Sequence, residues 1–289
     1  MKVEQNENTG WQEKWPAPAK LNLMLRIVGQ RADGYHLLQT VFQFVEWCDW
    51  LSFHPVNDGR VGLSSPTAGI PEQQDLIVRA ANLLKQVTGS LQGVRIVVEK
   101  NLPMGGGLGG GSSDAATTLV ALNQLWNTQL TKQALMEVGL QLGADVPVFI
   151  NGNAAWAEGV GEALTNIDLP ENWIVILKPD CHVDTKEIFT AKELTRNSKQ
   201  ITIADFIAGQ QNNDCLAVVR KLYRSVGGAL DDLSKYGNAK LTGTGACVFA
   251  EFSSEEEARV AYTALSMKWQ AHLTKGLNRS LVYADKKIE

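Results

Sequence analysis

Residues 100–116 of this chain read Lys-Asn-Leu-Pro-Met-Gly-Gly-Gly-Leu-Gly-Gly-Gly-Ser-Ser-Asp-Ala-Ala. Because glycine has no Cβ, a run with six glycines can turn sharply and bring its backbone close to a ligand. The alternating, β-branched residues 94–99 before the run predict a strand. The alanine-rich residues 115–125 after it predict a helix, with capping residues at 112–114. A strand, a glycine loop and a helix start predict an anion site, since unpaired amides and the helix dipole favour negative charge there.

Two common phosphate-binding motifs do not account for this loop. A Walker loop needs a lysine directly after its last glycine, whereas serine follows Gly111. The dinucleotide fingerprint G-x-G-x-x-G matches Gly105, Gly107 and Gly110, but it also needs an acidic residue about 20 positions later, at the end of a second strand. Residues 115–136 contain no Asp or Glu and predict one helix followed by another. A flexible glycine turn without a ligand is the structural alternative.

Length and composition describe a globular chain. Its 289 residues are enough for one large domain or two modest ones, and 44% are hydrophobic and 20% charged. The net charge of −4 offers no basic surface for nucleic acid, and no apolar run reaches the roughly 20 residues of a membrane span. Four cysteines (Cys48, Cys181, Cys215 and Cys247) form no C-x-x-C pair, which predicts free thiols in a reducing, cytoplasmic setting, without zinc or a disulfide framework.

The rest of the chain carries a simple pattern of elements. Residues 1–13 are polar and lack an apolar signal core, which predicts a loose extension. Asp33-Gly34 predicts a turn between two strands. The other predicted elements are a loop over 57–74, helices over 75–85, 112–126 and 131–142, a hairpin over 151–164, and strands over 173–178 and 248–252.

Two further motifs lie near the ends of the chain. Pro18-Ala-Lys-Leu-Asn-Leu23 falls in an alternating strand, residues 19–27, that places Lys20 and Asn22 on one face. Alternation alone favours an ordinary solvated face of an antiparallel sheet for these two residues. The second motif, Leu241-Thr-Gly-Thr-Gly-Ala-Cys247, leads into a predicted strand. It is either a tight glycine turn between two elements or a second group of backbone amides that binds phosphate.

Together the three motifs resemble those of the GHMP kinases, a family of small-molecule kinases. Pro103–Ala116 resembles the ATP-binding motif, Pro18–Leu23 the N-terminal motif and Leu241–Cys247 the C-terminal motif, in the family's order. Two more stretches, Gly-Gln-Arg-Ala-Asp-Gly-Tyr-His at 29–36 and Leu-Gly-Ala-Asp-Val-Pro-Val-Phe at 142–149, are most similar to the members that act on cytidine diphosphate-linked methylerythritol.

The resemblance implies a kinase that uses ATP and Mg²⁺ to phosphorylate a hydroxyl of that small molecule in the non-mevalonate isoprenoid pathway. It makes Asp145 the base that accepts the hydroxyl proton, and Lys20 the group that orients it. By local rules Asp145 is equally a helix N-cap before Pro147, and one carboxylate can serve both roles. The ATP site implied by the motif comprises Lys100, Pro103, Met104, Gly105, Gly106, Gly107, Leu108, Gly109, Gly110, Gly111, Ser112 and Ser113.

Magnesium would bridge phosphate oxygens near Ser112 or Ser113, with no dedicated protein metal ligand. On the acceptor side the resemblance implies a substrate site made of Asn22, Tyr35, His36, Thr185 and Phe189. Tyr35 and Phe189 would lie on opposite faces of the cytosine, because aromatic rings support a flat base by stacking. Phe189 alone is more often a core residue. Where the family commonly has Asn near the adenine, this chain has Asp75.

The implied fold is α+β, with a two-domain GHMP kinase architecture of antiparallel-rich mixed sheets packed with helices. The active cleft would lie between the domains. The expected division is a 1–15 extension, a 16–166 ATP-binding and catalytic domain, and a 167–289 C-terminal domain. No nucleic-acid or membrane partner is expected, and a homodimer is one of the oligomeric states left open. The rival functions are another kinase of the family, for mevalonate or homoserine, and a nucleotide-binding protein without catalysis.

Overall fold

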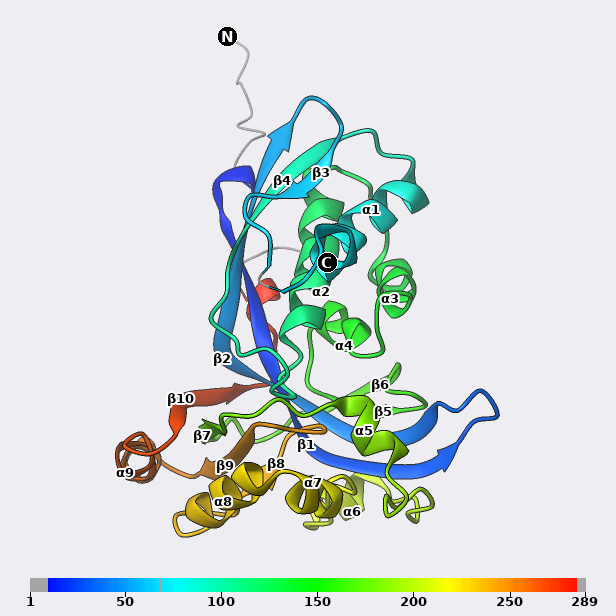
Figure 1. The fold of residues 1–289 in the computed structure, drawn as a ribbon. Helices are drawn as coiled ribbons and strands as arrows, with labels where there is room; N and C mark the ends of the chain where they lie inside the picture. Colours follow the sequence, from blue (N-terminus) through cyan, green and yellow to red (C-terminus); the bar gives the residue numbers. More distant parts are fainter. Residues whose placement is uncertain (1–9, 68, 285–289) are drawn as a thin grey trace.

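The computed structural model describes residues 10–67 and 69–284, and a mixed sheet runs through both halves of the molecule (Figure 1). Its strand order is β3-β4-β2-β10-β7-β9-β8, with β1 and β5 also paired to β2, and β6 to β5. Every pairing is antiparallel except β3 with β4, which confirms the antiparallel-rich architecture. The strands are β1 (Lys14–Gln30), β2 (His36–Val56), β3 (Val61–Leu63), β4 (Gly93–Glu99), β5 (Ala155–Glu158), β6 (Ala163–Asn166), β7 (Trp173–Lys178), β8 (Lys240–Leu241), β9 (Val248–Phe252) and β10 (Gln270–Leu277).

The helices form two sets, one for each half of the sheet (Figure 1). Beside β1–β4 lie α1 (Leu76–Thr88), α2 (Gly110–Leu125), α3 (Lys132–Leu140) and α4 (Val146–Asn151). Around β7–β10 lie α5 (Thr185–Thr190), α6 (Ile203–Ile207), α7 (Leu216–Leu222), α8 (Arg224–Leu233) and α9 (Glu255–Leu265). Short 3-10 helices occupy Gly10–Gln12, Glu72–Gln74 and Leu281–Tyr283. None of the helices within the described ranges is long and apolar enough to cross a membrane.

The long β1–β2 hairpin connects the two halves. Near its open end Trp15 packs in the core of the first half, whereas Leu25 and Ile27 pack in the core of the second half with Val175 of β7. The strands of the first group end at Asn166 and the second group begins at β7. We propose residues 16–166 and 167–289 as the two domains, with the hairpin tip reaching across from the first to the second.

The first strand differs from its prediction. β1 begins at Lys14, and Trp15 is already fully buried, so the ordered fold starts before residue 16. Residues 1–9 of the predicted extension lie outside the described residues. Register shifts after Pro18, Asn22 and Ile27 break the simple alternation, and both faces of most of the strand are buried. A solvated face is therefore excluded, because sheet strands lie on one side and helices on the other.

The helix starts are set by local hydrogen bonds. Asp75 caps α1 by accepting from the amide of Ile77 at 2.9 Å, and Thr131 caps α3 as predicted. In α2 the cap is Gly109, so Ser112, Ser113 and Asp114 lie inside the first turns and do not precede the helix. The predicted loop 57–74 also contains β3 and a 3-10 turn.

Candidate active site

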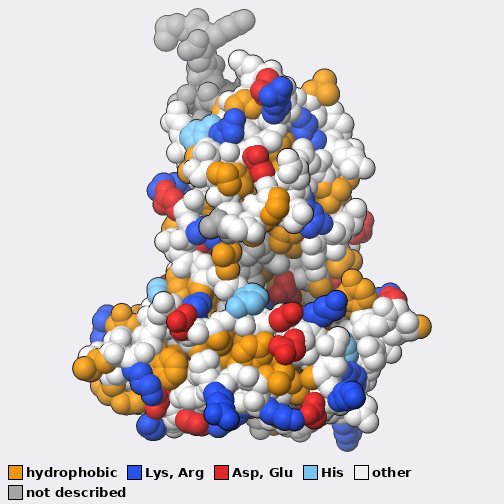
Figure 2. Space-filling view, viewed as in Figure 1, with side chains coloured by type: hydrophobic (Ala, Val, Ile, Leu, Met, Phe, Trp, Pro, Cys, Tyr) orange, Lys and Arg blue, Asp and Glu red, His pale blue; other side chains and the backbone are white. Residues whose placement is uncertain are grey.

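A cavity of about 1250 Å³ opens where the two halves of the molecule meet. Its walls come from β1, β2, the glycine loop, α5, the residues just before α4 and the turn before β9. Figure 2 shows acidic and histidine side chains at this waist, between the upper and lower halves. The cavity brings together ten of the predicted site residues, namely Lys20, Asn22, Tyr35, His36, Gly107, Gly109, Ser112, Asp145, Thr185 and Phe189.

The buried ammonium of Lys20 is the centre of this site. Its side chain is 3% exposed, and its Nζ lies 3.2 Å from Asp145 Oδ2 and 2.6 Å from Asn22 Oδ1. The same nitrogen donates to the carbonyl of Gly107 at 3.3 Å and lies over the ring of Phe42. A buried charge needs such partners, because an unpaired ammonium loses its hydration without compensation. Lys20 therefore joins a strand, the glycine loop and the start of α4.

Asp145 presents its carboxylate to the cavity. It occupies the N-cap position of α4, with Pro147 in the first turn, but its side chain makes no capping hydrogen bond. That side chain is 38% exposed, so one part of the carboxylate meets Lys20 and the rest faces the open space. Asp145 thus occupies a cap position in the chain, while its carboxylate is free to contact a bound molecule in the cavity.

Asn22 holds Lys20 in place. Its Oδ1 accepts from Lys20, its Nδ2 donates to Thr40 Oγ1 at 2.8 Å, and its backbone amide donates to Thr242 Oγ1 at 3.0 Å. Both polar atoms of the buried side chain thus have protein partners. The structure gives Asn22 a positioning role, and its contact with a substrate stays a prediction.

The two glycine motifs bind each other through their backbones. Amides of Ala246 and Cys247 donate to the carbonyls of Gly105 and Gly106 at 3.2 and 3.1 Å. Thr242 Oγ1 donates to the carbonyl of Gly107 at 3.2 Å. Part of the 241–247 turn therefore supports the first loop, while its Gly243 and Thr244 line the cavity.

Asn213 braces this turn from behind. Its Nδ2 donates to the carbonyls of Leu241 and Gly243 at 2.9 and 2.8 Å, and its Oδ1 accepts from the amide of Cys215. The polar run 212–214 was visible in the sequence, but nothing local connects it with a turn 28 to 30 residues later.

Gly107 and Gly109 have backbone conformations that suit only glycine. Their φ angles are +75° and +73°. A Cβ on Gly107 would lie 2.4 Å from the carbonyl oxygen of Thr242, and one on Gly109 would lie 2.8 Å from the ring of Phe149. The sharp course of the loop depends on both features, since positive φ strains other residues and the neighbours leave no space.

The remaining predicted ATP residues shape the loop from outside the cavity. Ser113 is fully buried, and its Oγ donates to the carbonyl of Pro18 at 2.7 Å. Leu108 is buried in the core and Met104 is exposed. These residues do not line the cavity, and neither do Lys100, Pro103, Gly105, Gly106, Gly110 and Gly111. Their contacts with ATP stay predictions.

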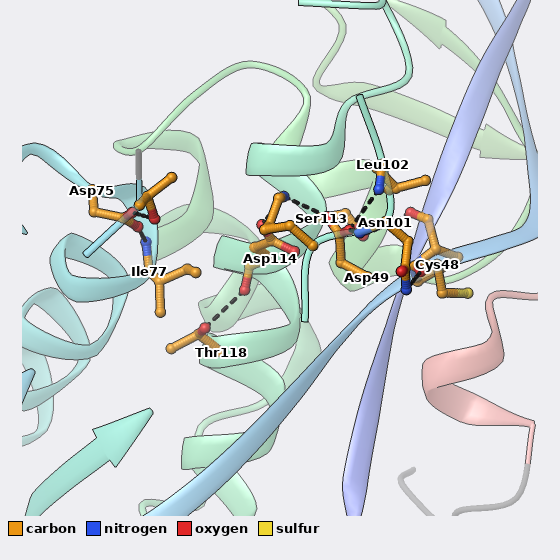
Figure 3. A network of polar contacts seen from close by, with 12 residues as sticks. Cys48, Asp49, Asp75, Ile77, Asn101, Leu102, Ser113, Asp114 and Thr118 are labelled. Carbon is orange, nitrogen blue, oxygen red and sulfur yellow. Dashed lines mark hydrogen bonds and ion pairs between the residues drawn. The ribbon is translucent and has the colours of Figure 1, made fainter. Parts of the chain in front are cut away.

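Lys100 contacts two buried carboxylates at the base of the loop, Asp49 and Asp114, and Figure 3 shows both. Its Nζ bonds Asp49 Oδ2 and lies 2.7 Å from Asp114 Oδ2. Asp49 Oδ1 also accepts from the amides of Asn101 and Leu102, at 2.6 and 2.7 Å. Asp49 was missed in the sequence, although an acidic residue within an apolar strand is a signal of a buried polar contact.

Asp114 carries an unusual carboxyl group. It is buried, and its Oδ1 has no hydrogen-bond partner within the described structure. Burial raises its pKa to about 7, against the lowering effect of Lys100. The carboxyl thus tends to keep its proton near neutral pH.

The end of the cavity near the tip of the β1–β2 hairpin is aromatic. The rings of His36 and Phe189 stack, with centroids 5.0 Å apart and planes 25° apart. Tyr35 is 63% exposed at the hairpin tip, so the ring that faces Phe189 in this structure is that of His36. Thr185 Oγ1 lies 2.9 Å from Thr244 Oγ1, a pairing that the sequence did not indicate.

The other histidines have different environments. His54 is exposed. His272 is half-buried and stacks on Trp47, with centroids 4.0 Å apart. Burial lowers the pKa of His272.

Comparisons with known proteins match the chain over most of its length and share its fold. The family models "GHMP kinases N terminal domain" and "GHMP kinases C terminal" match residues 75–153 and 191–271. A protein of Nitrosococcus oceani named 4-diphosphocytidyl-2-C-methyl-D-erythritol kinase is 56% identical over 268 residues, 93% of this chain and 96% of the relative. One of the same name from Methylococcus capsulatus is 58% identical over 269 residues, 93% of this chain and 92% of the relative.

The chain belongs to the GHMP kinases. A crystal structure of 4-(cytidine 5'-diphospho)-2C-methyl-D-erythritol kinase resembles this GHMP kinase with a TM-score of 0.79 and 30% identity, covering 91% of this chain and 99% of that one. The mevalonate kinase of L. major, solved with R-mevalonate, has a TM-score of 0.68 at 15% identity over 93% of this chain and 97% of its own. The second likeness shows the shared fold alone.

Replacing Gly107 with alanine tests the loop geometry. Gly107→Ala adds both backbone strain and a clash with Thr242, so the KM for ATP should rise at least about tenfold. Gly89→Ala is the matched control, because Gly89 has φ +71° but nothing within 4 Å of its added Cβ. The control should lower the melting temperature modestly and leave the KM for ATP unchanged. Equal ATP parameters in both variants would contradict a constrained loop.

Replacing Asp114 with asparagine tests the buried carboxyl. Native Asp114, with its pKa raised from 3.8 to about 7, keeps a proton that the unfolded chain loses above pH 4. Its contribution to stability therefore falls between about pH 4 and 7 and then levels off. Relative to wild type, Asp114→Asn should gain about 3 kcal/mol in unfolding free energy from pH 4.5 to 8.

Urea unfolding at a series of pH values measures this difference. Asp58→Asn, at an exposed turn position, is the control and should track the wild-type pH dependence. Parallel curves for Asp114→Asn and wild type would show that the carboxyl titrates normally.

Proposed function

We propose that this GHMP kinase transfers the γ-phosphoryl group of ATP to the 2-hydroxyl of 4-diphosphocytidyl-2-C-methyl-D-erythritol, in the non-mevalonate route to isoprenoid precursors. The observation that carries the proposal is the Lys20–Asp145 ion pair beside the glycine loop, in one cavity with an aromatic acceptor end. The names of the relatives that match over nearly the whole chain support the choice of substrate.

The triphosphate of ATP would lie along Gly107, Gly109 and Ser112. These residues line the cavity at the start of α2, a helix of 16 residues. The first-turn amides and the helix dipole favour the negative charge of the phosphates there. The backbone amides of the loop could approach the phosphates closely, because Gly107 and Gly109 have no Cβ.

In this proposal the carboxylate of Asp75 does not contact the adenine. It is buried, and its Oδ1 accepts from the amide of Ile77 while its Oδ2 accepts from Thr67 Oγ1 at 2.5 Å. Both oxygens are therefore occupied, one by the first turn of α1 and the other by the preceding loop.

The residues present fit a magnesium ion that is held mainly by the nucleotide. Mg²⁺ keeps several waters and commonly binds substrate phosphates with few protein ligands. Ser112 lines the cavity, so its hydroxyl could reach the ion, whereas Ser113 is committed to the Pro18 carbonyl. Within the described ranges no three His, Cys, Asp or Glu side chains gather as a metal cage. When bound, the ion would neutralise charge on the phosphate oxygens.

Asp145 would accept the proton of the attacking hydroxyl. Lys20 orients that carboxylate through their 3.2 Å contact and places a positive charge near the phosphoryl group. Phosphoryl transfer needs mainly such positioning and charge stabilisation. A nucleotide-binding protein without catalysis would not need this pair beside the loop.

The cytosine would lie at the aromatic end of the cavity, with Tyr35, His36 and Phe189 around it. Thr185 and Thr244 would face the substrate from the second half of the molecule. The cytoplasmic location, the absence of a nucleic-acid partner and the oligomeric state stay predictions.

Asp145→Asn tests the base. The variant keeps the side-chain shape but cannot accept the proton, so kcat should fall by about 10²–10⁴-fold. Binding of ATP should change little, whereas the melting temperature should fall, because the variant removes the negative partner of the buried Lys20 ammonium. Asp231→Asn, at an exposed carboxylate of α8 that pairs with Arg220 of α7, is the control and should keep wild-type turnover. Wild-type turnover in Asp145→Asn would exclude the base assignment.

A direct acceptor assay tests the proposed function. Purified protein, ATP and Mg²⁺ are incubated separately with 4-diphosphocytidyl-2-C-methyl-D-erythritol, mevalonate and homoserine, and ADP formation is followed. We expect turnover with the cytidine compound and a product phosphorylated at the 2-hydroxyl. Turnover with mevalonate or homoserine instead would assign another member of the family, and ATP binding without ADP formation would exclude catalysis.

A further inference from the structure

The guanidinium of Arg196 joins the two sides of the aromatic end of the cavity. Its Nε donates to Nε2 of His36 at 3.2 Å. Its terminal nitrogens donate to the carbonyls of Phe189 and Ala191, both at 2.8 Å, and of Leu194 at 3.1 Å. Arg196 thus ties β2 of the first half to the end of α5 in the second half, 160 residues away from His36 in sequence.

These bonds determine the protonation of His36. A guanidinium has only donors, so the nitrogen that receives its N–H must offer a lone pair. Nε2 of His36 therefore carries no proton, and the neutral ring carries its proton on Nδ1. Burial and the charge of Arg196 both lower the pKa of His36, in agreement with a neutral ring.

The same bonds fix the position of the ring. Arg196 holds the main chain of Phe189, and His36 stacks on the ring of Phe189. One planar group thus positions both aromatic side chains at once. Lysine could replace only part of this, because its ammonium has no rigid fork of donors to hold both side chains at once.

We propose that Arg196 is a positioning residue for recognition of the substrate's base, and that it acts by holding His36 as the Nδ1–H tautomer against Phe189. This inference rests on the proposed function. The Nδ1–H group is a donor, and it suits a base edge with acceptors. Cytosine offers acceptors at N3 and O2, whereas uracil carries a proton at N3. Arg196 would thereby favour cytidine over uridine compounds without touching the base.

The tautomer of His36 can be measured without any substrate. In protein labelled with ¹⁵N-histidine, the NMR shifts of the two ring nitrogens identify which one is protonated, and His36→Gln assigns the signals. We expect a protonated Nδ1 and an unprotonated Nε2 in wild type, and a substantial Nε2–H population in Arg196→Met. A wild-type His36 with its proton on Nε2 would overturn the proposal, whether or not the variant folds.

Kinetics test the consequence for the substrate. In Arg196→Met the KM for the cytidine substrate should rise about tenfold, the factor for one hydrogen bond, with kcat and the KM for ATP within about twofold of wild type. Arg196→Lys should recover part of the loss. Arg220→Gln, at an exposed arginine of α7, is the control and should change none of these values. Equal effects of Arg196→Met on both substrates would indicate a general structural role and overturn the proposal.

Two further experiments test whether Arg196 acts through His36 and whether it affects the choice of base. In a His36→Ala background, Arg196→Met should add little to the KM, whereas additive effects would contradict action through His36. Inhibition by CDP should exceed inhibition by UDP in wild type, and this preference should shrink in Arg196→Met. If wild type does not phosphorylate the cytidine compound at all, the proposed function fails, while the tautomer measurement still reports on Arg196 and His36.

Discussion

The fold around the cavity depends on one buried positive charge. The ammonium of Lys20 is nearly inaccessible to water, and its partners come from β1, the glycine loop and α4. Leaving such a charge unpaired would be strongly unfavourable, so these three segments are stable only when assembled together. The charge that organises the segments is also the one that faces the proposed phosphoryl transfer. The fold and the proposed reaction therefore both need a positive charge at Lys20.

The second constraint is the pairing of the two glycine motifs. The turn at 242–247 binds successive carbonyls of the loop at 105–107, and Asn213 holds that turn from its other side. The loop belongs to the first half of the molecule and the turn to the second, so their hydrogen bonds also fix the two halves relative to each other. The β1–β2 hairpin and Arg196 add further connections at the acceptor end. The cavity is consequently a product of both halves.

Much of this could be predicted from local sequence. The six glycines, the flanking strand and the following helix identified the loop, and spacing placed α1, α3, β7 and β9 within a few residues. The three motifs identified the family. The exact start of α2 could not be predicted, because Gly109 takes the cap in a positive-φ conformation that tertiary contacts with Phe149 and Lys20 enforce.

The partners that complete the site were not predictable. Asp49 meets Lys100 across 51 residues, and Arg196 meets His36 across 160. Spacing along the chain carries no information on such pairs, because strand register and domain packing decide them. For Asn22 the family resemblance implied a substrate contact, which stays a prediction. Its hydrogen bonds to Lys20 and Thr40 were not indicated by spacing.

A crystal structure of the ternary complex with a non-hydrolysable ATP analogue and the cytidine compound tests the central claim most directly. We predict that the triphosphate follows Gly107 to Ser112 and that the acceptor hydroxyl lies within about 3 Å of the Asp145 carboxylate, in line with the γ-phosphorus. A triphosphate bound away from the glycine loop, or a hydroxyl that Asp145 cannot reach, would contradict the account.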